Sequence, residues 1–372
     1  MKVLIAAGAS GGHIFPAIAL GSSLRRKADN LEILFVCSNR YLDRRIFSRE
    51  GLNFRCLSSN KLTPRLSFSL LAFPARLALD MAKALFIIAA FRPKVIVGFG
   101  GYASFPIVLI GSLAGIPAVI HEQNVAIGKA NLFLARFAKK IAVSFKETIS
   151  RIPDGMKEKV VYTGNPIRTD LLKDDKELAL KKFGFDRDKF TLLVIGGSQG
   201  AHRLNRIFAE SIASLEEARK KDIQIVHIAG EQDKESIEAI YDNFDIPALV
   251  FSFLDRIDEA YSAADLVFSR SGSAALSELA YYAKPMVLVP YPYARSHQKE
   301  NALAFAGKGA AIYKEEGELT PREFRSMVLE LMDNREKLAI LSKMSRSLSM
   351  PDASDRLADV VMVYNTFIHN KL

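Results

Sequence analysis

The feature that most limits the fold of this chain is the regular alternation of short runs rich in Val, Ile and Leu with longer helical patterns. Such runs are typical of strands buried on both faces of a parallel sheet, and the longer patterns fit crossover helices. Strands are expected in the first half at 2–6, 32–37, 94–98, 118–121 and 140–143, and in the second half at 191–195, 224–229, 249–251, 266–269 and 286–289.

Each half of the chain opens with a strand that runs directly into a glycine-rich loop, at 3–12 and 193–200. Later in each half, a proline precedes an apolar strand and a polar loop that ends in Asn, at 117–131 and 285–301. Similarity at corresponding positions of the two halves indicates a duplicated fold. We therefore predict an α/β protein built from two doubly wound, Rossmann-like domains.

Turn residues cluster at 164–166, where the strand signals of the first half stop. This cluster places the domain boundary, so we expect an N-terminal domain at 1–163 and a C-terminal domain at 164–345. The last segment, 346–372, contains the pattern of an amphipathic helix, and the N-terminal domain is one candidate for the surface that it packs on.

The net charge of +10 indicates an anionic partner, which could be nucleic acid, a phosphorylated substrate or an acidic membrane surface. Cys37 and Cys56 lack the spacing of a metal site or a disulfide framework, which favours a reducing compartment. The chain starts with a strand rather than a signal peptide, so a cytoplasmic location is expected. Pro and Gly interrupt the apolar stretch 103–120, which predicts a buried helix and a strand rather than a membrane span.

Glycine-rich loops follow four of the expected strands, at 8–13, 98–104, 196–201 and 271–275. In an open parallel sheet, ligands bind beyond the carboxyl ends of the strands, where loop amides and helix N-termini present N–H groups to anions. Each loop alone could be a structural turn. Loops at equivalent strand ends in both halves favour a phosphorylated ligand held in a cleft between the domains.

Two side chains near these loops suit particular chemistry. His13 would lie in the first turn of a helix, where it could face a ligand or cap the helix. Glu278 follows the fourth loop, and a carboxylate there could accept hydrogen bonds from two vicinal ribose hydroxyls or remain a solvated helix charge. The polar segments 121–124 and 290–298 are further candidate substrate loops.

Several other site types are disfavoured. The first glycine loop lacks the spacing of a nicotinamide-binding loop, and no Walker phosphate loop is present. Asp186 and Asp188 resemble a metal-binding pair but precede their strand, at the wrong end of the sheet, so we predict no protein-bound metal. His202 and His227 have no partner spacing.

The combined motifs resemble those of the MurG family, the peptidoglycan N-acetylglucosaminyltransferases of GT-B architecture, and the resemblance covers nearly the whole chain. The motifs lie at 8–16, 98–102, 121–124, 164–168, 196–201, 270–272 and 277–278. The resemblance implies transfer of N-acetylglucosamine from UDP-N-acetylglucosamine to the C4 hydroxyl of the muramoyl sugar of lipid I. The acceptor would be undecaprenyl-pyrophosphoryl-muramoyl-pentapeptide, the product lipid II, and the transfer would invert the anomeric carbon.

The resemblance also implies which residues bind the two substrates. The UDP-sugar would contact Ser198 near the pyrophosphate, Leu254 near the uracil and Glu278 at the ribose, with Asn124, Arg168 and Gln298 lining the same site. The lipid pyrophosphate would lie on the first domain. Its expected binding residues are Ser10, Gly11 and Gly12, with Gly100, Gly101, Tyr102, Glu122 and Gln123 in the acceptor-side loops.

An inverting displacement needs a base for the acceptor proton and positive charge for the leaving UDP. His13 is the expected base, although a positioning hydrogen bond to substrate would explain it equally well. No cofactor is expected besides the substrate. The chain departs from the family pattern at Ala9-Ser10, at Ala274-Ala275 and at His297, so donor contacts near these positions remain open.

A lipid-linked acceptor implies a peripheral location on the cytoplasmic face of the plasma membrane, and a role in cell-wall synthesis, cell shape and division. Segment 66–91 combines apolar residues with Arg76 and Lys83, which suits an anionic membrane surface, although a core helix with basic flanks would look similar. The alternatives are a UDP-N-acetylglucosamine 2-epimerase, another GT-B enzyme, or a non-catalytic nucleotide- or membrane-binding protein. Basic residues are dispersed, so a nucleic-acid partner is not expected.

Overall fold

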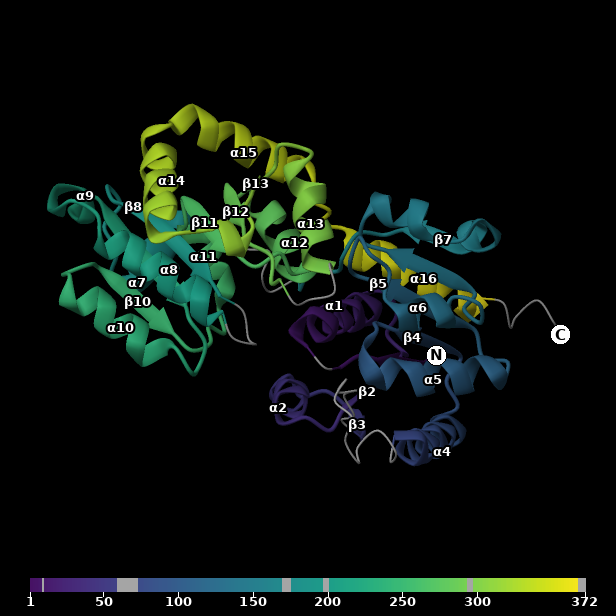
Figure 1. Ribbon diagram of the computed structural model, residues 1–372. Helices are drawn as coiled ribbons and strands as arrows, with labels where there is room; N and C mark the ends of the chain where they lie inside the picture. The colour runs from purple at the N-terminus through teal and green to yellow at the C-terminus, as the bar shows by residue number, and fades with distance from the viewer. Residues whose placement is uncertain (9, 59–72, 169–174, 197–200, 293–296, 367–372) are drawn as a thin grey trace. The chain divides into compact units, whose positions relative to one another are not determined.

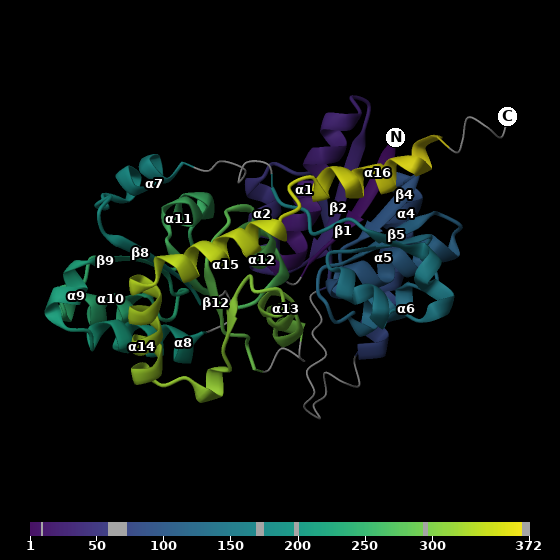
Figure 2. The ribbon, with the colours of Figure 1, turned by 90° about the horizontal axis from the view of Figure 1, so that it is seen from above.

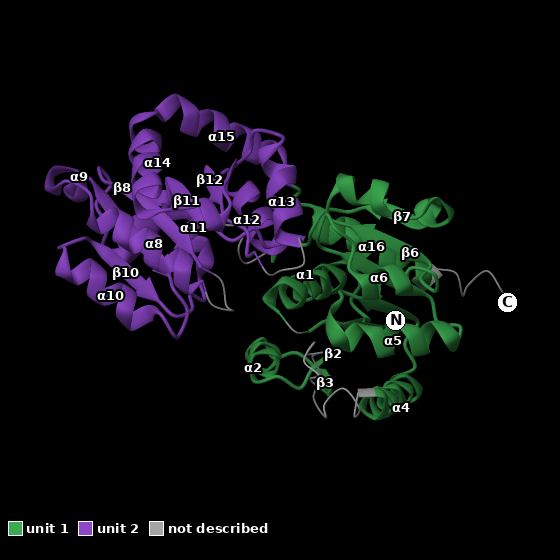
Figure 3. Ribbon diagram, in the orientation of Figure 1, with its two compact units in different colours: residues 1–169, 350–372 green, residues 170–349 purple. Residues whose placement is uncertain are grey.

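The computed structural model describes residues 1–8, 10–58, 73–168, 175–196, 201–292 and 297–366. The chain forms two compact units (Figure 3). Unit 1 contains residues 1–169 and 350–372, and unit 2 contains residues 170–349. The division therefore falls after residue 169 rather than after 163, and the closing segment belongs to unit 1 from residue 350 onward.

The first unit contains a seven-stranded parallel sheet in the order β3-β2-β1-β4-β5-β6-β7 (Figure 1). The strands are β1 (Lys2–Ala6), β2 (Glu32–Ser38), β3 (Phe54–Leu57), β4 (Val95–Gly98), β5 (Ala118–Glu122), β6 (Lys140–Val143) and β7 (Val160–Tyr162). The register sets Ile5 of β1 opposite Phe35 on one side and Val97 on the other. The strand order reverses between β1 and β4, which is where a doubly wound sheet opens a binding crevice.

Helices cover both faces of this sheet (Figure 2). They are α1 (Gly11–Lys27), α2 (Tyr41–Arg49), α4 (Phe73–Phe91), α5 (Gly101–Leu113), α6 (Lys129–Leu134) and α16 (Ala353–Thr366), with 3-10 helices at Lys146–Arg151 and Asp154–Lys159. Side chains alternate along a strand, so Val3 and Ile5 join the core beneath α1, α2 and α16, while Leu4 and Ala6 join the core beneath α4, α5 and α6.

The closing helix α16 is an integral part of unit 1. Leu357, Ala358 and Val361 are fully buried in the same core as the α1 side chains. At the edge of this contact, Arg26 of α1 donates to Asp355 of α16 at 2.9 Å. The amphipathic pattern at the end of the chain is therefore explained by docking on α1.

The second unit repeats the plan with a six-stranded parallel sheet in the order β10-β9-β8-β11-β12-β13. The strands are β8 (Phe190–Ile195), β9 (Ile223–Ile228), β10 (Ala248–Phe251), β11 (Leu266–Ser269), β12 (Met286–Leu288) and β13 (Ile312–Tyr313). The helices are α7 (Lys176–Phe183), α8 (His202–Ala213), α9 (Glu217–Lys221), α10 (Lys234–Asn243), α11 (Ile257–Ala263), α12 (Ser273–Tyr281), α13 (His297–Ala306), α14 (Pro321–Asp333) and α15 (Arg335–Ser347), with a 3-10 helix at Glu316–Glu318.

The predicted α/β fold class is confirmed, and each strand expected from the sequence is present. Strands β3, β7 and β13 were not predicted, and all three lie at sheet edges. An edge strand pairs on one side only, so its sequence can be short and mixed. In β3 the exposed Arg55 interrupts the apolar run, and β13 has two residues.

The stretch 103–120 is helix α5 followed by strand β5, as predicted. None of the described helices is both long and apolar enough to span a bilayer.

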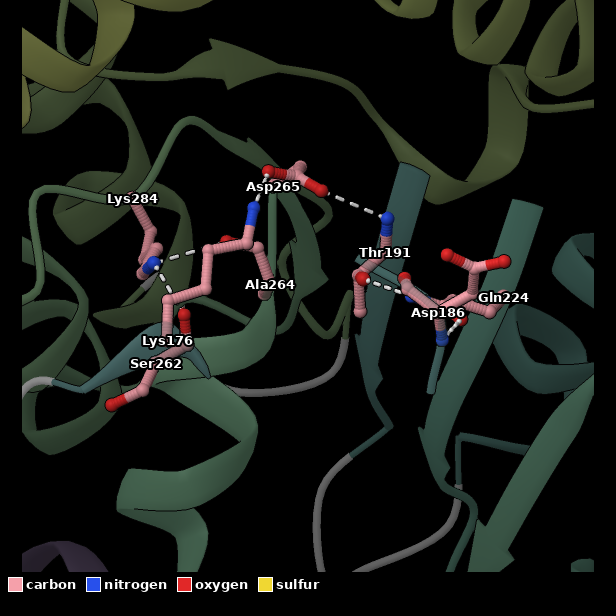
Figure 4. Close-up of polar contacts among 8 residues, drawn as sticks. All are labelled: Lys176, Asp186, Thr191, Gln224, Ser262, Ala264, Asp265 and Lys284. Atoms are coloured by element: carbon pink, nitrogen blue, oxygen red, sulfur yellow. Dashed lines mark hydrogen bonds and ion pairs between the residues drawn. The ribbon is translucent and has the colours of Figure 1, made fainter. Parts of the chain in front are cut away.

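Asp186 lies at the amino edge of the second sheet, as its position ahead of β8 predicted (Figure 4). The Gln224 amide accepts from the Asp186 N–H at 2.9 Å and donates to the Asp186 carbonyl at 2.7 Å. Next to it, Asp265 accepts from the Thr191 N–H at 2.9 Å. These contacts hold the start of β8, at the end of the strand opposite to the glycine-rich loop.

We predict that Val361→Ala lowers the free energy of unfolding of unit 1 by about 2 kcal/mol, because it removes buried methyl groups and leaves a cavity between α16 and α1. Val363→Ala on the same helix is the matched control, since that side chain is 48% exposed. Urea unfolding of both variants measures the difference. Equal losses in the two variants would show that α16 does not contribute to this core.

Candidate active site

The glycine-rich loops of unit 1 meet at the carboxyl ends of β1 and β4. Gly101 has φ +73°, and a Cβ atom there would lie 2.3 Å from the Gly8 carbonyl oxygen. Gly100 has φ +84°, and a Cβ atom there would lie 3.2 Å from the His13 ring. Only glycine therefore allows the two loops to pack together with the imidazole between them. The residues expected in the acceptor-side loops and His13 are brought together here.

A chain of hydrogen bonds runs from His13 through the loop after β5. His13 Nδ1 lies 3.1 Å from Gln123 Oε1. Gln123 Nε2 lies 2.8 Å from the Phe99 carbonyl and 3.1 Å from His121 Nδ1. His121 Nε2 lies 3.1 Å from the Gly164 carbonyl.

The direction of these hydrogen bonds follows from the backbone carbonyl groups, which can only accept. Gln123 Nε2 faces the carbonyls of Phe99 and His121, which only accept, so this atom is the amide nitrogen. Gln123 Oε1 must then accept from His13 Nδ1–H. His121 Nδ1 accepts from Gln123, and its Nε2–H donates to the Gly164 carbonyl. Neutral His13 therefore carries its lone pair on Nε2.

Burial keeps both imidazoles neutral. It lowers the pKa of His13, although the carboxylates of Glu122 and Asp43 and the bond to Gln123 act in the opposite direction. It lowers the pKa of His121 to about 4. His13 is thus a neutral imidazole with an accepting Nε2 at physiological pH, which is the state that a general base requires.

Glu122 is buried, and both of its carboxylate oxygens are occupied by its own loop. Oε1 accepts from the backbone N–H of Asn124 at 3.0 Å and from its side-chain amide at 3.2 Å. Oε2 accepts from the Gly128 N–H at 3.0 Å and from Asn131 Nδ2 at 2.8 Å. The predicted site residues Glu122 and Asn124 therefore lie together, and the carboxylate fixes the loop.

Tyr102 connects the glycine-rich loop to α4. Its hydroxyl donates to Asp80 Oδ2 at 2.8 Å, and the backbone N–H and hydroxyl of Ser58 donate to Asp80 Oδ1 at 3.1 and 2.9 Å. Asp80 is fully buried. The sequence analysis did not identify Asp80, although a lone carboxylate in an apolar helix was a usable signal.

Arg168 and Asn165 lie in the segment that follows β7. The Arg168 guanidinium lies 4.5 Å from the centre of the Phe15 ring on α1. The Asn165 amide is buried, and neither its oxygen nor its nitrogen has a hydrogen-bond partner among the described residues. Gly164, with φ +78°, leaves room for Met350, because a Cβ atom at 164 would lie 2.8 Å from its sulfur.

Ser10, Gly11 and Gly12 lie at the start of α1, as predicted. Ser10 is the residue before the helix, and its hydroxyl makes no capping hydrogen bond. Gly11 lets the Phe15 ring approach, since a Cβ atom there would lie 3.0 Å from it.

In unit 2, Glu278 is held by a residue that the sequence analysis missed. The buried Tyr261 hydroxyl donates to Glu278 Oε2 at 2.7 Å, and the Tyr261 ring packs against Tyr282. The preceding positions Ala274 and Ala275 lie in the first turn of α12 and are partly buried.

Gln298 lies on α13 beside the loop that follows β11. Its side-chain oxygen accepts from the Tyr291 N–H at 2.8 Å, and its carbonyl accepts from the Ser271 hydroxyl at 2.7 Å. His297 begins α13, and Leu254 is partly buried in the segment after β10. Ser198 lies outside the described residues.

Family models match both units. The glycosyltransferase family 28 N-terminal domain matches residues 3–143, and the C-terminal domain of that family matches residues 191–357. A curated relative from Desulforamulus reducens is 33% identical over 97% of this chain and 97% of its own length. It is named as a UDP-N-acetylglucosamine–N-acetylmuramyl-(pentapeptide) pyrophosphoryl-undecaprenol N-acetylglucosamine transferase. The chain belongs to the MurG family of glycosyltransferases.

Other comparisons agree with MurG-family membership. A relative of the same name from Halothermothrix orenii is 34% identical over 97% of this chain and 98% of its own length. The crystal structure of Acinetobacter baumannii MurG has a TM-score of 0.74 and 26% identity, and the match covers 98% of this chain and all of that one. The two-domain GT-B architecture is therefore confirmed.

The epimerase alternative shares the fold of this MurG-family chain. A UDP-N-acetylglucosamine 2-epimerase from Neisseria meningitidis has a TM-score of 0.68 over 98% of this chain and all of that one, but its identity is 13%. A likeness at this level shows the fold alone.

The described part of this MurG-family chain contains no group of three or more His, Cys, Asp or Glu side chains placed to hold a metal ion. The expectation of a metal-free reaction stays a prediction.

We predict that His121 makes stability depend on pH. Its folded pKa of about 4 lies below the ordinary value, so below about pH 6.5 the unfolded state binds more protons and stability falls. The expected loss from this residue between about pH 7 and about pH 5 is about 2 kcal/mol. Urea unfolding of the wild type and His121→Asn at both pH values measures it, and an unchanged pH dependence in the variant would contradict the assignment.

Proposed function

We propose that the chain transfers N-acetylglucosamine from UDP-N-acetylglucosamine to the C4 hydroxyl of the muramoyl sugar of lipid I, forming lipid II with inversion of the anomeric carbon. The observation that carries this proposal is the match to transferases of that name along 97% of the chain, through both units. On this proposal the enzyme acts in peptidoglycan synthesis, and through it in cell shape and division.

The two units divide the substrates between them in this proposal. Unit 2 binds the UDP-sugar, with the ribose at Glu278 and further donor contacts at Leu254, Gln298 and Ser198. Unit 1 binds the lipid pyrophosphate at its glycine-rich loops, where Gly100 and Gly101 allow the loops after β1 and β4 to pack closely around His13. Support for the ribose contact comes from the Tyr261 hydroxyl, which holds one carboxylate oxygen of Glu278 in place.

His13 is the proposed base. Its Nδ1–H is engaged by Gln123, so Nε2 takes the proton from the acceptor C4 hydroxyl while that oxygen attacks the anomeric carbon. The bond between the anomeric carbon and the diphosphate oxygen breaks, and UDP leaves with the electron pair. Glu122 is the nearest alternative base, but its four accepted hydrogen bonds commit it to the loop.

The departing diphosphate gains negative charge as this bond breaks. N–H groups at the starts of α8 and α12 and the guanidinium of Arg168 are the proposed stabilisers, because helix N-termini and fixed cations favour developing anions. We propose that these groups replace a divalent metal ion, so that UDP-N-acetylglucosamine is used without a cofactor.

We further propose that unit 1 binds the cytoplasmic face of the plasma membrane through α4. Leu79, Leu85 and Phe86 project apolar side chains into solvent, and Phe86 is 75% exposed. Arg76 and Lys83 on the same helix are exposed cations that attract anionic headgroups. An exposed apolar surface rimmed by cations fits a peripheral membrane contact better than a solvated helix face. The predicted patch residues 66–72 lie outside the described residues.

A basic pocket of about 380 Å³ adds to the positive surface of unit 1. Arg136, Lys139, Lys140 and Lys159 line it with Glu158 as the only acid. It adjoins α6, which packs on the same face of the sheet as α4 and α5. These cations lie where β6 and β7 begin, and their excess over acidic residues suits an anionic partner.

The proposed function is tested by UDP release from UDP-N-acetylglucosamine with and without a lipid I analogue, following the sugar into product. Acceptor-dependent transfer is expected. His13→Gln should lower kcat by about 10²- to 10⁴-fold while donor affinity stays unchanged, because the proton acceptor is lost. His369→Gln in the same chain is the control. UDP release without acceptor would favour an epimerase, and donor binding without turnover a binding protein.

We predict that Leu85→Ser with Phe86→Ser reduces sedimentation with vesicles of phosphatidylglycerol by about tenfold or more, because two exposed apolar anchors are lost. Turnover of a water-soluble acceptor should remain unchanged. The matched control is Phe244→Ser in unit 2, a side chain that is 46% exposed. Equal vesicle binding by both proteins would remove α4 as the contact.

A further inference from the structure

A second chain of hydrogen-bonded polar side chains lies at the start of α8 in unit 2, and every member except the exposed His202 is buried. Its members are His202, Asp233, Asn205, His227 and Tyr241, and hydrogen bonds join each to the next. His202 Nδ1 bonds to Asp233 Oδ1, and Asn205 Nδ2 donates to Asp233 Oδ2 at 2.7 Å. Further in, His227 Nε2 lies 3.2 Å from Asn205 Oδ1, and His227 Nδ1 lies 2.8 Å from the Tyr241 hydroxyl.

These contacts allow one arrangement of hydrogens. Asn205 Nδ2 uses both of its hydrogens, one for Asp233 and one for the Ala229 carbonyl at 2.8 Å. Asn205 Oδ1 must therefore accept from His227 Nε2–H. His227 Nδ1 then accepts from the Tyr241 hydroxyl. Burial lowers the pKa of His227 to about 3 and raises that of Tyr241, so both groups stay neutral and this direction is kept.

These hydrogen bonds fix α8 against the ends of two strands. Asn205 is on α8, the Ala229 carbonyl follows β9, and Asp233 directly precedes α10. Gly196 follows β8, and a Cβ atom there would lie 2.4 Å from Asn205 Oδ1. The Asn205 amide thus fills the space over Gly196. The first turn of α8 is thereby placed relative to both β8 and β9.

We propose that Asp233, acting through Asn205 and His202, is a positioning residue for the diphosphate of the sugar-nucleotide donor. It sets the direction of the N–H groups at the start of α8. Parallel N–H groups at a helix N-terminus bind an anion only when they converge on it, so a small rotation of the first turn weakens the contact. This inference rests on the proposed function, which assigns the donor to unit 2.

The test exchanges the residues at 205 and 233, because Asn205 is the donor and Asp233 the acceptor of the hydrogen bond between them. Asn205→Asp sets a carboxylate against Asp233 and the Ala229 carbonyl, and it should raise the KM for UDP-N-acetylglucosamine about tenfold. Asp233→Asn removes the charge and should raise that KM about threefold. The double variant restores the hydrogen bond between positions 205 and 233 but leaves the Ala229 carbonyl without its donor, so its donor KM should recover in part, to clearly below that of Asn205→Asp. The KM for the lipid I analogue should change by less than about twofold throughout. The kcat should fall in both single variants, because the same N–H groups stabilise the departing diphosphate.

Arg206→Gln is the matched control, because Arg206 is on α8 and pairs with Glu210, with a 75% exposed side chain. Thermal unfolding checks that each variant is folded. A folded double variant without recovery, or equal increases in both KM values, would overturn the proposal. If Asn205→Asp does not fold, an unchanged donor KM in folded Asp233→Asn overturns it. If the wild type does not turn over UDP-N-acetylglucosamine with the lipid I analogue, the proposed function is refuted instead.

Discussion

The direction of hydrogen bonding at Gln123 is the interaction on which the site of unit 1 depends. Its amide accepts from His13 and donates to the Phe99 carbonyl and to His121, so one side chain ties the loops after β1, β4 and β5 together. Because an amide has fixed donor and acceptor ends, it also selects the His13 tautomer. The same contacts therefore build the loop and prepare the base.

In unit 2, Asn205 and Asp233 hold the helix after the first strand in the way that Gln123 does in unit 1. The hydrogen bonds of unit 1 lead to the buried His121, and those of unit 2 lead to the buried His227, which also bonds to Tyr241; burial keeps both histidines neutral. A Cβ atom at Gly100 would meet the His13 ring, and a Cβ atom at Gly196 would meet the Asn205 amide. Both units thus use a hydrogen-bonded amide and a buried histidine to hold the first turn of a helix against the ends of strands.

Much of the fold was predictable because its signals are local. Continuous apolar strands, glycine loops and the break at 164–166 identified a doubly wound duplication, and the structure confirms the strands. The edge strands β3, β7 and β13 escaped prediction because one-sided pairing makes weak demands on sequence. The division between the units lies beyond the turn residues, since the segment containing Gly164 remains packed on α16.

The sequence by itself determined the fold class, the family and the loops where substrates are expected, because these depend on residue types at short spacing. Tertiary structure alone decided how the loop side chains are used. Glu122 and Asn124 bond to each other, Tyr102 is joined to Asp80, and the His13 tautomer is set from Gln123, which lies far along the chain. The Tyr102 and His13 pairings join residues distant in sequence, so they depend on which elements become neighbours, and hydrogen-bond direction is defined only once both partners are in place.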